Sequence, residues 1–232
     1  MWALGLMLVA LGVAVCGKSD LGVSMIAAPA FIVSEFLSRF SGFFSVGTTE
    51  YLLQAFLILI MCLTVRRFDW RYLTAFLTAV IYGYILDLFL YLLRNVSFET
   101  AAARWVMLLI GDVLVAAGVA CFFHTYLPLQ AHELFVAETS RRFSLNIRKV
   151  KWIFDLSFLA LSVFLALVLF RDAGEFDWAE IGYRSYHSIG PGTIVTTVIN
   201  APVIALAGKA VERFFDASAA FPRLEKIMKR KG

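Results

Sequence analysis

Six long apolar stretches constrain this chain more than any other feature of its sequence. They cover residues 2–16, 50–65, 72–93, 105–123, 152–170 and 193–211. Each reaches or approaches the roughly 20 mostly apolar residues that a helix needs to cross a membrane. The chain is 61% hydrophobic and 16% charged, whereas soluble domains are about 45–50% apolar. We therefore expect an all-α, polytopic membrane protein with six transmembrane helices.

The first apolar stretch is expected to be a permanent helix, not a secretory signal. A signal peptide has a basic start and a small residue before its cleavage point. Here no lysine or arginine lies near the start of the apolar stretch. The residue before Cys16 is Val15, which is not a small residue. All three cysteines lie inside apolar stretches, where a lone cysteine usually acts as a small packing residue. We therefore assign the cysteines no redox role, and we expect no cofactor.

The two halves of the chain are similar to each other. Residues 5–22 align without a gap to residues 111–128, with 8 identities in 18 positions. A long self-match at a fixed offset favours duplication, with chance similarity of apolar segments as the alternative. The matched glycines, Gly5 and Gly12 with Gly111 and Gly118, fall seven residues apart on one helical face. Small residues let membrane helices approach closely, so we expect these two helices to form the contact between the halves.

Three helices per half would give the second half the opposite orientation in the membrane, a 3+3 inverted repeat typical of transporters. The repeats are expected at residues 1–95 and 104–213, followed by a basic cytoplasmic tail at 214–232. With the N-terminus in the cytoplasm, 15 of the 21 basic residues fall on the inner side. Such a bias sets orientation. It predicts a multi-pass protein of a bacterial inner membrane with both termini cytoplasmic.

Two further segments, at about residues 18–47 and 125–147, occupy equivalent places after the first helix of each half. Each begins at a turn marked by Gly or Pro and continues as an amphipathic helix too short or too polar to span. Short apolar runs of this kind are re-entrant or interfacial. Two interpretations stay open. The segments either dip into the membrane from opposite sides, or lie flat on its two surfaces.

Several motifs resemble those of the YczE/YitT-type bacterial integral membrane proteins. They are "KSDLGVS" at 18–24, "SVGTTE" at 45–50, "GYILDLF" at 83–89 and "SIGPGTIVTTVINAPVI" at 188–204. The second half departs from the family pattern, because Ala131, His132 and Glu133 follow Pro128 where an aspartate is usual. If this segment has a functional acidic residue in place of the usual aspartate, that residue would be Glu133. The resemblance implies a bacterial inner-membrane protein that looks like a transporter, but it supplies no substrate.

Polar side chains at membrane depth are costly and usually face the bundle interior or a cavity. Asp87 and Asp112 lie inside apolar stretches, and Asp20 and Glu50 flank the first short segment. We expect these acids to converge on an outward-facing pocket that attracts a small polar or cationic solute. Structural pairing of Asp87 and Asp112 with Arg104, Lys18 or backbone groups is the alternative. The candidate solute-binding residues are Asp20, Ser24, Thr48, Glu50, Gln54, Asp87, Asp112 and Asn200.

The equivalent polar residues of the inner side are His124, Thr125, His132, Glu133 and Asn200. Adjacent His132 and Glu133 do not share a helical face, and the chain has no His-x3-His or cysteine pair, so we expect no metal site. Lys151 and Asp155 should form an i, i+4 ion pair. The "SIGPGT" stretch offers backbone N–H groups either to an anion or, as we favour, to helix capping.

No enzyme motif is present, and the basic residues form no nucleic-acid-binding pattern. We expect a small permease, or the solute-binding membrane subunit of a larger importer. A non-transporting accessory protein, which binds a partner, is the alternative, and a channel is the least favoured class. The expected partners are the lipid bilayer, the solute, and a second copy or a partner membrane protein.

Overall fold

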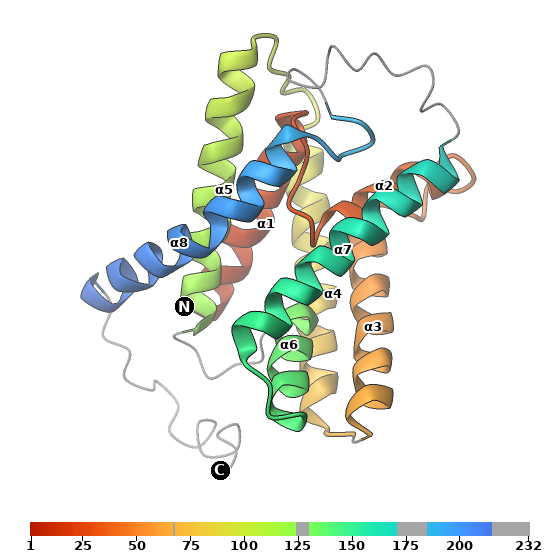
Figure 1. Cartoon of the computed structure of the whole chain (residues 1–232). Helices are drawn as coiled ribbons and strands as arrows, with labels where there is room; N and C mark the ends of the chain where they lie inside the picture. Colours follow the sequence, from red (N-terminus) through yellow and green to blue (C-terminus); the bar gives the residue numbers. More distant parts are fainter. Residues whose placement is uncertain (67, 124–129, 171–184, 215–232) are drawn as a thin grey trace.

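The computed structural model describes residues 1–66, 68–123, 130–170 and 185–214, and Figure 1 shows their arrangement. These residues form helices joined by loops, with one isolated bridge between Tyr186 and Ile189. The helices are α1 (Trp2–Lys18), α2 (Ala28–Leu37), α3 (Val46–Val65), α4 (Arg71–Leu92), α5 (Ala101–Phe123), α6 (Ala131–Arg142), α7 (Ile147–Leu169) and α8 (Pro191–Phe214). The expected all-α class is confirmed for the described residues. Each of the six apolar stretches matches a helix, and the stretches at 72–93 and 152–170 extend one residue beyond α4 and α7.

Four of the described helices, α3, α4, α5 and α7, are long and apolar enough to cross a membrane. Helix α8 would be a fifth if its two arms are counted as one span. The arms, Pro191–Asn200 and Pro202–Ala210, meet at 48°, because a proline inside a helix lacks the N–H of one hydrogen bond and clashes with the preceding turn. Helices α1 and α2 are shorter apolar helices.

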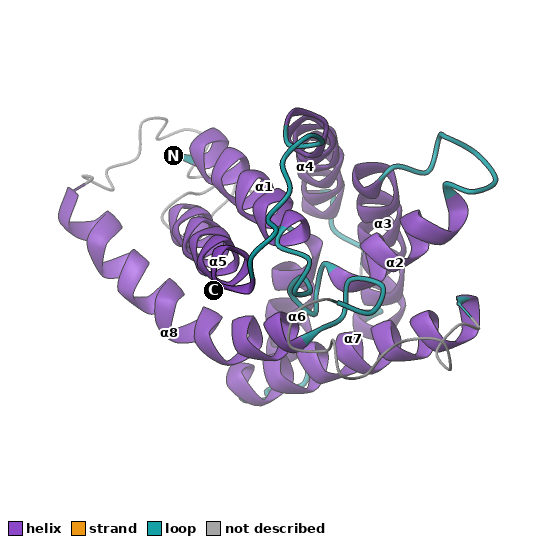
Figure 2. Cartoon of the chain, turned by 90° about the horizontal axis from the view of Figure 1, so that it is seen from above, coloured by secondary structure: helices purple, strands orange, loops and turns teal. Residues whose placement is uncertain are grey.

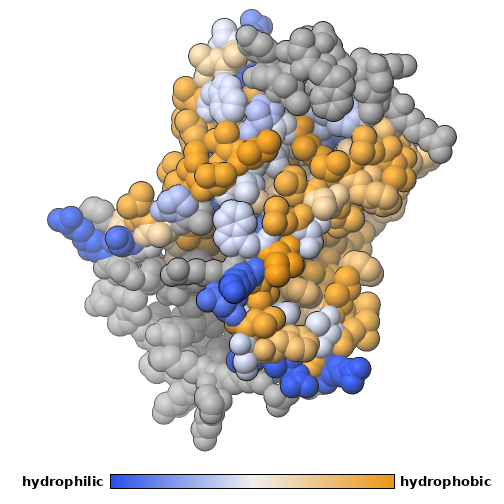
Figure 3. Space-filling model, viewed as in Figure 1, coloured by the Kyte–Doolittle hydropathy of each residue, from blue (hydrophilic) through white to orange (hydrophobic). Residues whose placement is uncertain are grey.

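The outer faces of these helices are apolar. On α3, Leu52, Phe56, Leu59 and Leu63 are exposed at helical spacing, with Leu63 70% accessible. Apolar side chains also dominate much of the surface of α7 (Figure 3). Exposure of so large an apolar surface to water would be unfavourable. The chain is therefore a protein with several membrane-type helices.

Helices α1 and α5 pack antiparallel through their glycines. A Cβ atom added to Gly12 would lie 2.6 Å from the Gly111 oxygen, and one added to Gly118 would lie 2.7 Å from the Gly5 oxygen. Those distances leave no room for a side chain, so the backbones touch as small residues permit. The expected contact between the two glycine-bearing helices is confirmed.

The contacts between helices follow a pattern that repeats when the two halves are exchanged. Helix α1 packs on α4 as α5 packs on α8; α2 packs on α3 as α6 packs on α7; and α3 packs on α6 as α7 packs on α2. Two pairs break the pattern. Helix α4 also packs on α6, whereas α2 and α8 make no extended contact along their described lengths. Helices α3 and α4 pack closely, whereas α7 and α8 make no extended contact along their described lengths and diverge across one side of the molecule (Figures 1 and 2).

The two short helices lie at opposite ends of α3. Ser34 of α2 donates a hydrogen bond to the Phe44 carbonyl oxygen, two residues before α3 begins (2.9 Å). Ser140 of α6, which is 106 residues later, donates to the Leu145 carbonyl oxygen, two residues before α7 begins (2.7 Å). Equivalent serines thus hold each short helix against the start of the helix that follows it.

Candidate functional site at the start of helix α6

A buried pair on α3 is joined to the first residue of α6. Glu50 and Gln54 are 4% and 0% accessible and lie four residues apart on one helical face. The Gln54 side-chain amide donates to Glu50 Oε1 (3.0 Å), and the Ala131 N–H donates to Gln54 Oε1 (3.2 Å). The first N–H groups of a helix have no partner within it. Gln54 therefore satisfies one such group of α6 from the neighbouring helix.

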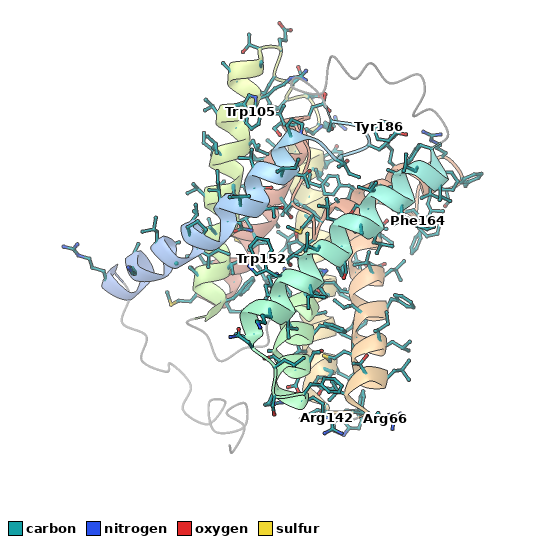
Figure 4. The ribbon with its side chains drawn as sticks, viewed as in Figure 1. Arg66, Trp105, Arg142, Trp152, Phe164 and Tyr186 are labelled. Carbon is teal, nitrogen blue, oxygen red and sulfur yellow. The ribbon has the colours of Figure 1, made fainter. Side chains whose placement is uncertain are left out.

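Helix α6 begins beside the middle of α3 and runs alongside its second half. Ala131 contacts Gln54, and further along α6 the side chains of Leu134 and Phe135 pack with Met61 and Val65 near the end of α3. Figure 4 shows Arg66 and Arg142, which follow α3 and end α6, together at one end of the molecule, with Trp105 and Tyr186 at the other. The start of α6 consequently lies well inside the bundle.

His132, the second residue of α6, is buried between α6 and α7. It is 1% accessible, and its ring meets the Phe158 ring edge to face at 5.6 Å. Burial, with a smaller effect of Lys151, lowers the pKa of His132 to about 3. The imidazole is therefore neutral at physiological pH. Within the part of the chain that the structure describes, its buried Nε2 has no hydrogen-bond partner, and the same holds for Nε2 of Gln130, the residue that precedes α6.

Glu133 lies within electrostatic range of groups on both α3 and α7. Burial raises its pKa, while Lys151 lowers it and Asp155 raises it to smaller extents. Glu50 interacts electrostatically with Glu133 as well. The expected i, i+4 ion pair between Lys151 and Asp155 is confirmed, at 2.8 Å. Side chains from three helices thus gather around the start of α6.

Tyr82 of α4 is a member of this cluster that the sequence did not reveal. It is 3% accessible and lies within electrostatic range of Glu50 and Glu133. The only sequence signal for Tyr82 was its position directly before Gly83, which opens the "GYILDLF" motif. Gln130 was also missed, because a glutamine before a helix resembles an ordinary loop residue.

The structure does not gather the four acids that were expected to share one pocket into a single cluster, because Asp20, Glu50, Asp87 and Asp112 each have different neighbours. Glu50 lies with His132 and Glu133, which the sequence had placed in a separate inner group. The physical reason is that α6 begins deep beside α3. A segment expected to approach from the far side reaches the middle of the first half.

Asp20 belongs to a loop junction. Its carboxylate accepts hydrogen bonds from Arg104 (3.3 Å) and from the Ser185 hydroxyl (3.0 Å), and its side chain is 47% accessible. The residue has a left-handed backbone with φ of 56°. The pairing with Arg104, which was one alternative for the other acids, is thus made by Asp20.

The glycine-rich loop before α8 packs on the residues that follow Asp20. The Gly192 N–H donates to the Leu21 oxygen (2.9 Å), and the Gly190 N–H donates to Thr193 Oγ1 (3.3 Å). Gly22 has φ of 104°, a conformation that favours glycine. These N–H groups are used for loop packing and helix capping, which was the favoured interpretation.

Asp87 of α4 caps the first turn of α3. Its carboxylate accepts hydrogen bonds from the Gly47 N–H (2.8 Å) and from the Ser45 hydroxyl. The Ser45 side chain in turn accepts from the Thr48 N–H (3.1 Å). A carboxylate at a helix N-terminus is favoured by the helix dipole. Asp87 therefore fastens α3 to α4, whereas Thr48 bonds to Ser45 within the start of α3.

Three further candidates lie apart from the α6 cluster. Asp112 is 4% accessible on α5 and lies near Cys16 of α1; among the described residues it has no hydrogen-bond or ion-pair partner. The Ser24 carbonyl oxygen accepts from the Ala28 N–H in the turn before α2 (3.0 Å). Asn200 lies at the bend of α8, and its buried Oδ1 has no hydrogen-bond partner among the described residues. His124 and Thr125 lie outside the described residues. Among the described residues no cluster fits a metal ion.

Fold and site define an all-helical protein with membrane-type helices and a buried polar cluster at the start of a short internal helix. The chain belongs to a family of unknown function, DUF6198, which it matches over residues 1–209. No curated protein and no solved structure matches the chain.

Proposed function

We propose that this protein is a small membrane permease, or the solute-binding membrane subunit of a larger importer, for a small polar or cationic solute. The observation that carries this proposal is the gathering of Glu50, Gln54, His132 and Glu133 beside the middle of α3. Ionisable groups at membrane depth are costly, and they mark solute or ion pathways in membrane proteins. The resemblance to the YczE/YitT-type proteins agrees with this class.

The proposed architecture has six spans, with α1 and the bent α8 added to α3, α4, α5 and α7, in a 3+3 inverted repeat. The repeating contact pattern and the equivalent serines, Ser34 and Ser140, support it. The pair Glu50–Gln54 also has a counterpart in Lys151–Asp155, which is four residues into α7 as Glu50 is into α3. Solute sites of such proteins lie near the midplane where the repeats meet.

Helices α2 and α6 are proposed to re-enter the membrane from opposite sides. The buried start of α6 at Gln54 supports this over a helix lying flat on the surface. Arg66, Arg141 and Arg142 gather at one end of the molecule, which we assign to the cytoplasm because basic residues concentrate there. The membrane is then the bacterial inner membrane, with both termini cytoplasmic.

The parted helices α7 and α8 are proposed to be the moving part of the permease. Their equivalents α3 and α4 are fastened together by Asp87 and the Gly47–Gly83 contact. Two repeats with largely matching contacts but one open and one closed hairpin can give access to the site from one side at a time.

The test measures thermal unfolding of the purified full chain against amines, amino acids, vitamins and anions. A ligand at a hundredfold excess over its dissociation constant adds about 2.7 kcal/mol. We expect one class to stabilise the parent and the Glu138→Gln variant, whose change lies on the far end of α6, but not Glu50→Gln. If no class stabilises the parent while all variants fold, the accessory protein becomes the better account.

A further inference from the structure

The charges around the start of α6 do not balance. From the described helices, α3 contributes Glu50, α6 contributes Glu133, and α7 contributes Asp155 with Lys151, whereas Gln54 and Tyr82 carry no charge. His132 is neutral at physiological pH. Three carboxylates therefore face one ammonium group.

Neither Lys151 nor the dipole of α6 removes this excess. Lys151 is paired with Asp155 at 2.8 Å, so its charge is already matched. The start of a helix carries the equivalent of roughly half a positive charge. Glu50 and Glu133 are left within electrostatic range of each other, with Glu50 4% accessible. Two carboxylates that share such a site do not both ionise without a counter-charge.

We infer that Glu50 and Glu133 together hold one exchangeable positive charge, either a proton or the ammonium group of a small amine, and that the protein exchanges one for the other. This inference rests on the proposed permease function and names its solute class. When the ammonium group enters, the shared proton leaves its carboxyl group for the solvent, so the charge of the site is unchanged.

Two buried polar side chains at the start of α6 indicate what the solute contains besides its ammonium group. Among the described residues, the buried Gln130 side-chain amide donor has no hydrogen-bond partner, and neither does His132 Nε2. A buried polar group without a hydrogen bond costs free energy. A solute with a hydroxyl or carbonyl oxygen near its amine would satisfy the Gln130 donor. A short amino alcohol fits, and we use ethanolamine as the probe.

The first arm of the test needs no solute. Infrared difference spectroscopy of the full chain in lipid should show a protonated carboxyl group at neutral pH. Glu50→Gln and Glu133→Gln should each shift the frequency of its signal or lower the pH at which the signal disappears, because each removes one of the two carboxyl groups that share the proton. Glu138→Gln should leave it intact. A parent with no protonated carboxyl group at neutral pH overturns the inference.

The second arm adds ethanolamine, with potassium chloride and ethylene glycol as controls for charge and hydroxyl. Ethanolamine alone should remove the carboxyl signal and release a proton, seen by calorimetry in two buffers of different ionisation enthalpy. Its apparent affinity should fall about tenfold per pH unit on acidification while one proton is displaced. Binding that releases no proton, or a carboxyl signal that ethanolamine leaves unchanged, overturns the exchange. Stabilisation by another solute class would in that case still support the permease.

Discussion

The α3–α4 hairpin and the α7–α8 pair occupy equivalent places in the proposed repeat, yet only the first is closed. Glycines 47 and 83 bring the backbones of α3 and α4 together, since a Cβ added to Gly83 would lie 2.6 Å from the Gly47 oxygen. Asp87 then caps α3 from α4. Helix α7 contains no glycine, and it packs on α2 and α6 instead of α8.

In the proposed permease, this difference separates a fixed part of the molecule from a moving one. Small residues and a cross-helix cap hold α3 where Glu50 and Gln54 can meet the start of α6. Close approach of that kind is the main source of helix association in a membrane, where burial of apolar surface gives little driving force. The α7–α8 pair lacks both devices, so its separation can change at small cost.

The largest expected effect comes from opening the closed hairpin. A Cβ added to Gly47 would lie 2.6 Å from Asp87 Oδ2 and would also meet the Gly83 backbone. We expect Gly47→Val to lower the free energy of unfolding by about 3 kcal/mol, because neither neighbour can give way. The measurement is a mixed-micelle unfolding titration. Gly208→Val on α8, where nothing lies within 4 Å, is the control, and equal losses would contradict the account.

Removal of the cap tests the same hairpin more gently. Asp87→Ala deprives the Gly47 N–H and the Ser45 hydroxyl of their acceptor. We expect a loss of about 2 kcal/mol in the same titration, as for hydrogen bonds to a charged group. Glu138→Ala, which removes the i, i+3 ion pair with the half-exposed Arg141, should cost less, about 1 kcal/mol. If Asp87→Ala cost no more stability than Glu138→Ala, the cap would not fasten α3 to α4. The α3–α4 hairpin would then not differ in this respect from the α7–α8 pair.

The stability of the α6–α7 side should depend on pH through His132. Its pKa is about 3 in the folded protein and about 6.5 in an unfolded chain. Between these values the unfolded state binds the extra proton, so stability is present above about 6.5 and is lost as pH falls. We expect about 2 kcal/mol less stability at about pH 5 than at neutral pH.

Glu133, whose pKa is raised by burial, acts in the opposite sense: its contribution is present at low pH and is lost as pH rises. The difference between parent and His132→Gln curves isolates the histidine. It should shrink as pH falls from about 6.5 towards about 3, because only the parent loses stability there. Parallel curves for the two proteins would mean that His132 titrates normally and is not buried as described.

The smallest effect concerns the equivalent serines. Ser34→Ala and Ser140→Ala each remove a hydrogen bond to the loop before the next long helix. We expect each to cost about 1 kcal/mol, and the two losses should agree. The unfolding titration measures both. A large loss at one serine and none at the other would show that α2 and α6 do not play matching parts.

The sequence predicts where the helices lie more successfully than how they meet. Periodic apolar runs determine the long helices, and the glycines 5, 12, 111 and 118 predicted the α1–α5 contact because spacing on a single helix is a local property. The site was only partly predictable. Glu50 and Gln54 lie on one face by spacing alone, but their neighbour, Ala131, is 77 residues away from Gln54.

The partners of the other candidate residues, and the way the helices meet, depend on tertiary packing. Asp87 looked like a solute ligand because a carboxylate in an apolar stretch is costly, yet the start of α3 supplies its partners. Likewise, nothing in the residues of α7 or α8 alone states that the two helices part. Helix α7 has no glycine through which α8 could approach closely, and it packs on α2 and α6.

Distances between spin labels test the central claim, a permease with one fixed and one moving hairpin, most directly. Labels at Leu59 of α3 and Leu77 of α4 report the closed hairpin, and labels at Val163 of α7 and Val198 of α8 report the open pair; all four side chains are exposed. The protein would be studied in lipid nanodiscs, with its native cysteines replaced, with and without ethanolamine. The account predicts one α3–α4 distance throughout and an α7–α8 distance that shifts on addition of the amine. An α7–α8 distance that stays the same under all conditions, or two pairs that move equally, would contradict it.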